Sequence, residues 1–330
     1  MKKYKICKIL LVILAIFLCV AFYELLGICV AYKKQPEVSN TTKKETKNGS
    51  WNECSENTER AVIIEKNPEA LLQRVRLIKN AKKEIILSTF AFQSDESGKL
   101  ILGALHDAAD RGVHIRLLVD GMESWIDMEG NPYFYGLSSH ENVEIKLYNK
   151  ANPLKPWKMM GRMHDKYLIA DGKRYILGGR NTYNYFLGDF PGHKNYDRDV
   201  LVVCDEPEKE NSVNQLLEYF ETIWEQEDSD YFHDNKKLAN RKSVKNAVLE
   251  LQNGYQKYFE ENKERICDTD YTDETFETEK IALVSNPIHT GSKEPVVWYQ
   301  LGELMKNAKN RVKIHTPYII CNDMMYNTWE

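Results

Sequence analysis

The feature that most constrains the fold of this sequence is a segment that occurs twice. Residues 79–92, KNAKKEIILSTFAF, recur 227 residues later as residues 306–319, KNAKNRVKIHTPYI. The first four residues are identical, and the segment after each tetrad has the character of a strand, with a threonine at the same place. Such self-similarity indicates that one structural unit begins a second time. We therefore expect one complete unit and the beginning of another.

Helical and strand patterns alternate through the first unit, from Arg60 to Trp224. The spacing of apolar residues predicts helices over 68–81, 98–111, 212–224 and 243–264, and strands over 84–92, 113–119 and 144–148. This alternation predicts an α/β fold, in which a mixed sheet is flanked by helices. The expected domains are a first α/β domain at 59–226, a helical and acidic connector at 227–279, and the beginning of a second α/β domain at 280–330.

The amino-terminal segment has the length and composition of a membrane anchor. A run of 24 residues from Ile9 to Tyr32 is interrupted only by Glu24, and about 20 apolar residues span a bilayer core. Four lysines precede the run and two follow it. This bias favours a cytoplasmic amino terminus and a body outside the membrane. We expect a single-pass membrane protein with its anchor at 1–32 and a polar stalk at 33–58.

Two alternatives to an uncleaved anchor remain open. A secretory signal peptide would be removed, although its apolar stretch usually has about 7–15 residues. Cleavage and lipidation at Cys29 would need a small residue where Ile28 stands.

Charge and cysteine content narrow the classes of ligand. The chain carries 45 basic and 49 acidic residues, for a net charge of −4, and the first 50 residues alone contribute +6. An acidic body does not bind nucleic acid by bulk charge, so an anion site requires a local basic patch. Residues 145–180 provide one, with nine basic and two acidic side chains. The seven cysteines form no C-x-x-C pair, so we expect no zinc site.

One motif in that basic stretch suits phosphodiester chemistry. Alternation along a strand places His164 and Lys166 on one face, and the Asp171-Gly172 turn then returns the chain antiparallel. The return would bring an amide back beside the imidazole and the ammonium. A nucleophile with two donors for phosphoryl oxygens is the combination that a phosphodiester requires. The motif residues are His164, Lys166, Asp171, Gly178, Gly179 and Asn181, and the glycines would let the backbone approach an anion closely.

The pattern H-x-K-x4-D-x6-G-G-x-N resembles the signature of the phospholipase D superfamily at every position. The segments RMH at 162–164 and GGRN at 178–181 are especially similar to those of bacterial cardiolipin synthases. The likeness extends over residues 60–226 and resumes at about residue 280. It implies a phospholipase D-like fold in which two copies of the motif meet around a pseudo-twofold axis, without a metal or other cofactor.

The resemblance also implies a role for each motif residue. One histidine of the pair attacks phosphorus to give a phosphohistidine, and the other protonates the leaving alcohol and then activates the acceptor. His164 would be the nucleophile or its acid/base partner. Lys166 and Asn181, with Gly178 and Gly179, would hold the phosphate. Asp171 would orient the motif.

The sequence departs from this pattern in one respect. Of its eight histidines only His164 begins an H-x-K, and the partner expected 227 residues later falls beyond the last residue. We therefore expect a truncated chain that lacks a carboxy-terminal half, with a homodimer of single-motif chains or an inactive remnant as alternatives.

These observations predict a membrane-anchored phosphatidyltransferase or phosphodiesterase of the cardiolipin synthase type. Its substrate would be an anionic phospholipid such as phosphatidylglycerol, and we expect no nucleic-acid partner. The alternatives are a membrane-tethered nuclease and an inactive half that binds lipid.

Overall fold

The computed structural model describes residues 2–48, 59–204, 206, 211–233, 235–314, 316 and 326. The chain divides into two compact units. The sheet unit comprises Cys54–Lys155 and Gly161–Ile281, and the terminal unit comprises Met1–Glu53, Pro156–Met160 and Ala282–Glu330.

Within the described residues, the sheet unit is built on nine strands in the order β8-β4-β3-β2-β5-β6-β7-β1-β9. The strands are β1 (Glu59–Ile64), β2 (Glu84–Thr89), β3 (His114–Asp120), β4 (Val143–Tyr148), β5 (Lys166–Ala170), β6 (Arg174–Gly178), β7 (Asp199–Cys204), β8 (Ser229–Tyr231) and β9 (Phe276–Glu277). The pairs β2–β3 and β3–β4 are parallel, and the other pairs are antiparallel. The expected mixed sheet is therefore confirmed.

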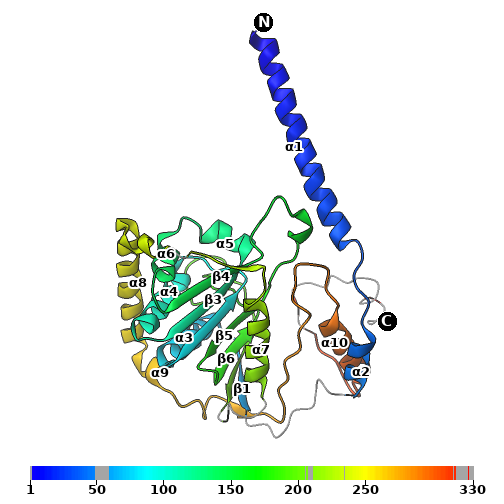
Figure 1. Ribbon diagram of the computed structural model, residues 1–330. Coiled ribbons are helices and arrows are strands. Elements are labelled where there is room, and N and C mark those ends of the chain that lie inside the picture. Colours follow the sequence, from blue (N-terminus) through cyan, green and yellow to red (C-terminus); the bar gives the residue numbers. More distant parts are fainter. Residues whose placement is uncertain are drawn as a thin grey trace. The chain divides into compact units, whose positions relative to one another are not determined.

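Helices cover both faces of this sheet (Figure 1). They are α3 (Asn67–Asn80), α4 (Glu96–Asp110), α5 (Gly121–Asp127), α6 (Pro132–Ser138), α7 (Ser212–Trp224), the 3-10 helix η3 (Lys236–Asn240), α8 (Lys242–Glu261) and α9 (Lys263–Cys267). The apolar core includes strand and helix residues such as Leu117, Leu168 and Leu105. On the α7 face, the Arg116 guanidinium lies over the Phe220 ring and the Lys146 ammonium over the Trp224 ring. Each helix predicted from the sequence is present: α7 has the predicted ends, and the ends of α3, α4 and α8 differ from the prediction by one to three residues.

Residues 227–281 pack into the sheet unit. Helix α8 approaches α4 so closely that a Cβ atom at Gly103 would lie 2.6 Å from the Leu251 carbonyl oxygen. In the acidic segment that follows, Glu274 accepts two hydrogen bonds from the buried Arg76 guanidinium, each 2.9 Å long. The Arg76 guanidinium also lies 3.9 Å from the centroid of the Tyr271 ring. The acidic composition indicates a linker, but these residues instead neutralise a buried cation.

The terminal unit contains α1 (Lys2–Tyr32), α2 (Asn40–Asn48), the 3-10 helix η2 (Pro156–Lys158) and α10 (Val296–Lys306). The stretch Tyr4–Tyr32 is long and apolar enough to cross a membrane, by length and composition, as a signal sequence also can be. Helix α2 lies in the segment expected to be a polar stalk. Its first turn is held by the Thr42 hydroxyl, which donates to the Glu294 carboxylate over 2.7 Å.

The second copy of the repeat begins with a helix at the expected place. Shifted by the repeat offset, α3 would cover residues 294–307, and α10 spans Val296–Lys306. Residues 311–314, which align with the start of β2, form no strand. Residue 315 and residues 317–319, the remainder of the repeat apart from Thr316, lie outside the described residues.

Candidate active site

The motif lies on the hairpin of β5 and β6, in the middle of the sheet. The two strands pair antiparallel, with Tyr167 opposite Leu177 and Ala170 opposite Arg174. The turn between them has Asp171 at φ 53° and Gly172 at φ 62°. Asp and Gly are residues that adopt this left-handed conformation readily. The hairpin predicted from the sequence is therefore present.

Asp171 joins this turn to the beginning of β2. Its carboxylate accepts hydrogen bonds from the backbone N–H groups of Lys82 (2.8 Å), Lys83 (2.7 Å) and Glu84 (3.0 Å). His164 precedes the other end of β5. The structure therefore places Asp171 away from the imidazole, where its carboxylate connects the hairpin to the neighbouring strand.

His164 and Lys166 lie together beside Phe90, which follows β2. The exposed imidazole makes an edge contact with the Phe90 ring, with ring centroids 4.6 Å apart. Lys166 is only 5% exposed, and its Nζ donates to the His164 carbonyl oxygen over 2.7 Å. No described residue hydrogen-bonds to the ring nitrogens of His164. The site thus presents an accessible imidazole next to a shielded ammonium.

Burial shifts the titration of both groups. Desolvation lowers the pKa of Lys166 to about 8, although the nearby Asp165 and Asp197 carboxylates favour its charged form. Desolvation by surrounding protein atoms and, secondarily, the Lys166 charge lower the pKa of His164 below its ordinary value. At neutral pH the imidazole is therefore mainly neutral, with a lone pair available, while the ammonium remains mainly charged.

The two glycines after β6 make room for carboxylates from the chain that enters β7. A Cβ atom at Gly179 would lie 2.0 Å from Asp197 Oδ2, and a Cβ atom at Gly178 would lie 2.1 Å from Asp199 Oδ1. The sequence interpretation assigned these glycines to the approach of an anion. In the structure, Asp197 and Asp199 occupy the space that a side chain at either position would need, so packing accounts for the two glycines.

The last residues of the motif point in different directions. The Asn181 side chain is buried, and its Oδ1 accepts from the backbone N–H of Ala91 over 3.2 Å. This contact places Asn181 next to Phe90, on which His164 packs. Arg180 is fully buried and donates to the carbonyl oxygens of Ile64 and Glu65. Arg180 is therefore held within the core, where the Asp199 carboxylate compensates part of its charge.

A buried carboxylate at the end of β3 holds the segment that enters the motif. Asp120 Oδ2 accepts from the backbone N–H of Met163 over 3.1 Å, and Oδ1 accepts from Arg162 Nη1 over 3.1 Å. Oδ1 also accepts from the N–H of Met122, the second residue of α5. Desolvation raises the pKa of Asp120, and the Arg162 charge opposes that shift. Asp120 thus connects β3, α5 and the residue before His164.

Sequence reasoning missed Asp120 and three other residues that surround the motif. Phe90 contacts the imidazole, Asp197 lies close to Lys166, and the Tyr219 hydroxyl of α7 donates to Asp165 Oδ2 over 2.8 Å. Asp120 and Asp197 lie in the segments 108–120 and 197–200, which share the resemblance to the superfamily, but the sequence assigned neither residue a role. Asp165 therefore faces α7.

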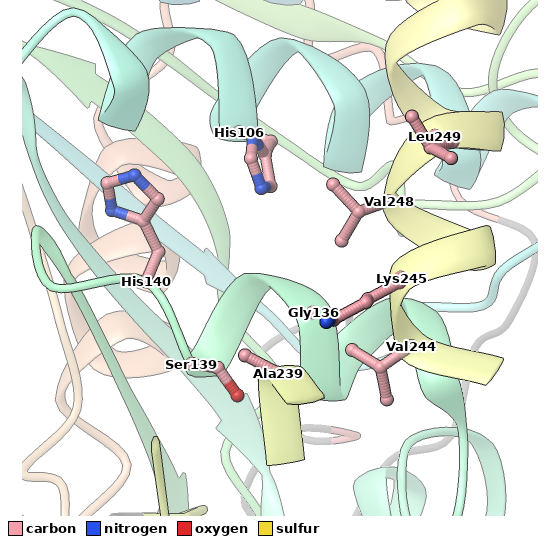
Figure 2. A pocket seen from close by; sticks show the side chains of 9 residues that line it. All are labelled: His106, Gly136, Ser139, His140, Ala239, Val244, Lys245, Val248 and Leu249. Carbon is pink, nitrogen blue, oxygen red and sulfur yellow. The ribbon is translucent and has the colours of Figure 1, made fainter. Parts of the chain in front are cut away.

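A cavity of about 450 Å³ lies between α4, α6, η3 and α8 (Figure 2). No motif residue lines it. Two of its histidines are joined through one carboxylate, because Asp110 contacts both His106 Nδ1 and His140 Nε2. Among the described residues, no group of three or more His, Cys, Asp or Glu side chains is arranged to hold a metal ion. Metal-independent chemistry stays a prediction from the resemblance.

Comparison with protein families and with other proteins identifies the sheet unit. A family model described as "Cardiolipin synthase, PLD-like domain" matches residues 74–224. An uncharacterized protein of Helicobacter pylori strain J99 is 30% identical over 212 residues, which cover 60% of this chain and 39% of that protein. Cardiolipin synthase C of Escherichia coli K12 is 29% identical over 171 residues, which cover 48% of this chain and 34% of that enzyme. The chain thus spans well under two thirds of these relatives.

Solved structures with a similar arrangement have low sequence identity. NucT from Helicobacter pylori has 16% identity and a TM-score of 0.41, over 53% of this chain and 99% of that chain. Phosphatidylserine synthase from Haemophilus influenzae has 16% identity and a TM-score of 0.44, over 67% of this chain and 48% of that chain.

The matched region extends from α3 to the end of α7 and contains the whole motif from His164 to Asn181. The resemblance to the phospholipase D superfamily that the motif indicates is therefore confirmed over residues 74–224.

Proposed function

We propose that this protein is a membrane-anchored phosphatidyltransferase or phosphodiesterase that works through a phosphohistidine at His164. The observation that supports this most directly is the exposed, largely neutral imidazole beside the buried ammonium of Lys166. Both residues lie in the part of the chain that matches the cardiolipin synthase-type family model.

The proposed reaction has two displacements. In the first, a ring nitrogen of His164 forms a bond to phosphorus, and the bond from phosphorus to the leaving alcohol oxygen breaks. The leaving oxygen takes a proton from a second acid. In the second, the same group, now without its proton, takes a proton from an acceptor alcohol or water; the acceptor oxygen bonds to phosphorus, and the bond from phosphorus to the His164 nitrogen breaks. The Lys166 ammonium, and an N–H of the Asn181 amide, would stabilise the negative charge on the phosphoryl oxygens in both steps.

The second acid has two possible sources in this proposal. One source is a second copy of this chain, paired so that two His164 side chains face one phosphate. The other is a second motif in a longer protein. The second source is compatible with the relatives, because the matched segments cover only 39% and 34% of two of them.

A phospholipid substrate is supported by the cardiolipin synthases among the relatives and by α1. These relatives include cardiolipin synthase 1 of Staphylococcus aureus, with 34% identity over 117 residues. A helix that crosses the bilayer would hold the catalytic unit close to phosphatidylglycerol. The basic stretch at 145–180 would attract its anionic headgroup.

Trapping the intermediate tests this proposal. The protein is incubated with phosphatidylglycerol that carries a labelled phosphate, quenched in alkali and digested, and the His164 peptide is searched for label. We expect an alkali-stable, acid-labile adduct on His164, and conversion to cardiolipin or phosphatidic acid. His164→Ala should lose both, whereas the control His114→Gln, which alters a histidine held by Glu84 and Glu144, should keep them.

Nuclease activity is the outcome that would overturn the phospholipid assignment. The same displacement cleaves nucleic-acid phosphodiesters, and the similar structures include NucT and Nuc. The expectation that nucleic acid is no partner stays a prediction, and the comparisons do not support it. Cleavage of single-stranded DNA, dependent on His164 and without any lipid turnover, would assign the site to nucleic acid.

A further inference from the structure

Three large apolar side chains stand in solvent at the edge of the sheet where His164 lies. Trp125 and Ile126 are each 68% exposed on α5, and Leu154, in the loop after β4, is 77% exposed. We refer to these three side chains as the apolar rim. Large exposed apolar side chains that gather at one place mark an interaction surface.

The apolar rim and the motif share one edge by strand topology. Strands β3 and β4 run parallel, so α5 and the loop after β4 both leave from their carboxyl ends. Strand β2 is parallel to β3, and β5 is antiparallel to β2, with Thr89 opposite Lys166. The beginning of β5, where His164 lies, is therefore at the same edge as the apolar rim.

Direct contacts also connect the two loops with each other and with the motif. A Cβ atom at Gly121, the first residue of α5, would lie 2.6 Å from the backbone nitrogen of Lys150. Arg162, two residues before His164, donates to Asp120 on one side and to the Asn149 carbonyl oxygen, over 2.7 Å, on the other. These contacts connect the beginning of α5 and the end of β4 with the catalytic segment.

We propose that the apolar rim inserts into the interfacial region of a phospholipid bilayer and sets His164 at the depth of the headgroups. This inference rests on the proposed function, because it names the surface by which the same site would meet its lipid. A tryptophan and aliphatic side chains next to lysines, here Lys150 and Lys155, have the composition that favours a membrane interface.

The continuation of the chain supports a lipid surface as the occupant. Helix η2 begins at Pro156, one residue after Lys155, and it packs against α1 within the terminal unit. A Cβ atom at Gly27 of α1 would lie 2.4 Å from Pro156 Cγ, near the end of the apolar stretch. Leu154 is thus separated by a single residue from a segment that contacts the proposed anchor.

Burial favours the neutral form of two acidic residues near Trp125. Desolvation, with contributions from Asp120 and Asp127, raises the pKa of Glu123. Desolvation also raises the pKa of Asp127, although its hydrogen bond with Gln93 lowers it. A raised pKa widens only the acidic pH range over which these carboxyls are neutral and do not repel anionic headgroups.

Photo-crosslinking tests the apolar rim without relying on activity. The photoreactive residue benzoylphenylalanine replaces Trp125 or Leu154 in the full chain, which is reconstituted in vesicles of phosphatidylcholine and labelled phosphatidylglycerol. The matched control replaces Phe276 on β9, which is 72% exposed at the other margin of the sheet. We expect labelled lipid on the chain from positions 125 and 154, and little from position 276.

Two outcomes would overturn the inference. One is an adduct of twice the chain mass without lipid label, which would assign the apolar rim to contact with a second copy of the chain. The other is equal lipid labelling from all three positions. A lipid adduct that persists in a chain without any phosphodiesterase activity would support the apolar rim and count only against the proposed function.

A kinetic measurement complements the crosslink. The double variant Trp125→Ser/Leu154→Ser should raise the KM for phosphatidylglycerol in vesicles by about tenfold, since two large apolar groups no longer leave water. Its kcat/KM for a short-chain, water-soluble phosphodiester should be unchanged, and Phe276→Ser should alter neither value. Equal losses on vesicle and soluble substrates would contradict a role in membrane docking.

Discussion

Lys166 shows how the environment of a single residue sets the chemistry of this site. The ammonium is almost completely removed from water, and among the described residues it donates a hydrogen bond to the His164 carbonyl oxygen. The Asp165 and Asp197 carboxylates compensate only part of the desolvation, so its pKa falls to about 8. A bound phosphate dianion or monoanion would restore the missing counter-charge. The site is therefore prepared for an anion.

We expect a bell-shaped pH dependence of kcat/KM. Activity should rise as pH increases through the lowered pKa of His164, because the neutral imidazole is the nucleophile. It should fall as pH passes about 8, because Lys166 loses the charge that binds phosphate. The alkaline limb of the kcat profile should lie at higher pH than that of the kcat/KM profile, because bound substrate stabilises the charged ammonium of Lys166. Initial rates from pH 5 to pH 10 measure both profiles.

Lys166→Arg provides the control for this assignment. An arginine keeps its charge throughout this range, so the alkaline limb should disappear from whatever activity remains. An unchanged alkaline limb in this variant would show that another group titrates there.

At the scale of elements, the β5–β6 hairpin and the entry to β7 form one packed assembly. Asp199, which is buried, contacts Arg74 Nη1 over 2.9 Å and Arg180 Nη1 over 3.3 Å. Removing one partner of such a buried group is costly, because a charge is left without compensation. Gly178 faces this carboxylate, so a side chain there would disturb the ion pairs as well as the hairpin.

Two glycine substitutions should have opposite effects on stability. Gly178→Ala should reduce the free energy of unfolding by about 1–3 kcal/mol, because its Cβ meets Asp199 and the Arg198 backbone. Gly254→Ala, in the exposed middle of α8 with no atom within 4 Å of the new Cβ, should increase it by about 1 kcal/mol. Urea denaturation of the two variants measures both changes, and a loss at Gly254 as large as that at Gly178 would contradict this packing.

At the scale of the whole molecule, the protein combines a large α/β unit with an apolar amino-terminal helix. The two features have different parts in the proposed function: the sheet unit contains the motif, and α1 would attach the protein to the membrane. The distribution of lysines around α1 predicts that the sheet unit lies outside the cytoplasm.

Membrane fractionation tests the anchor. The full chain, expressed in a bacterial host, should stay with the membrane in alkaline carbonate and dissolve in detergent, with residues 1–32 still present by mass spectrometry. Protease added to spheroplasts should digest the sheet unit and spare the amino terminus. A soluble product that has lost the apolar segment would instead identify a cleaved signal sequence, and a lipid-modified Cys29 would identify a lipoprotein.

Much of the architecture was predictable because it depends on local patterns. The Ser212–Trp224 helix was predicted with its observed ends, and the turn at Asp171-Gly172 predicted the hairpin. The segment at 268–279 was harder to interpret. Its acidic composition indicates a linker, and only the structure shows that Glu274 neutralises Arg76, almost 200 residues earlier in the chain.

By itself, the sequence determined the motif, the alternation that puts His164 and Lys166 on one face, and the apolar length of α1. These properties depend on residue spacing, which is the same in any environment. Only the tertiary structure decided that Lys166 is buried, that Asp197 and Asp199 fill the space beside the glycines, and that Asp120 joins the motif to the apolar rim. Desolvation and charge coupling depend on atoms that are distant in the chain, and folding alone brings those atoms together.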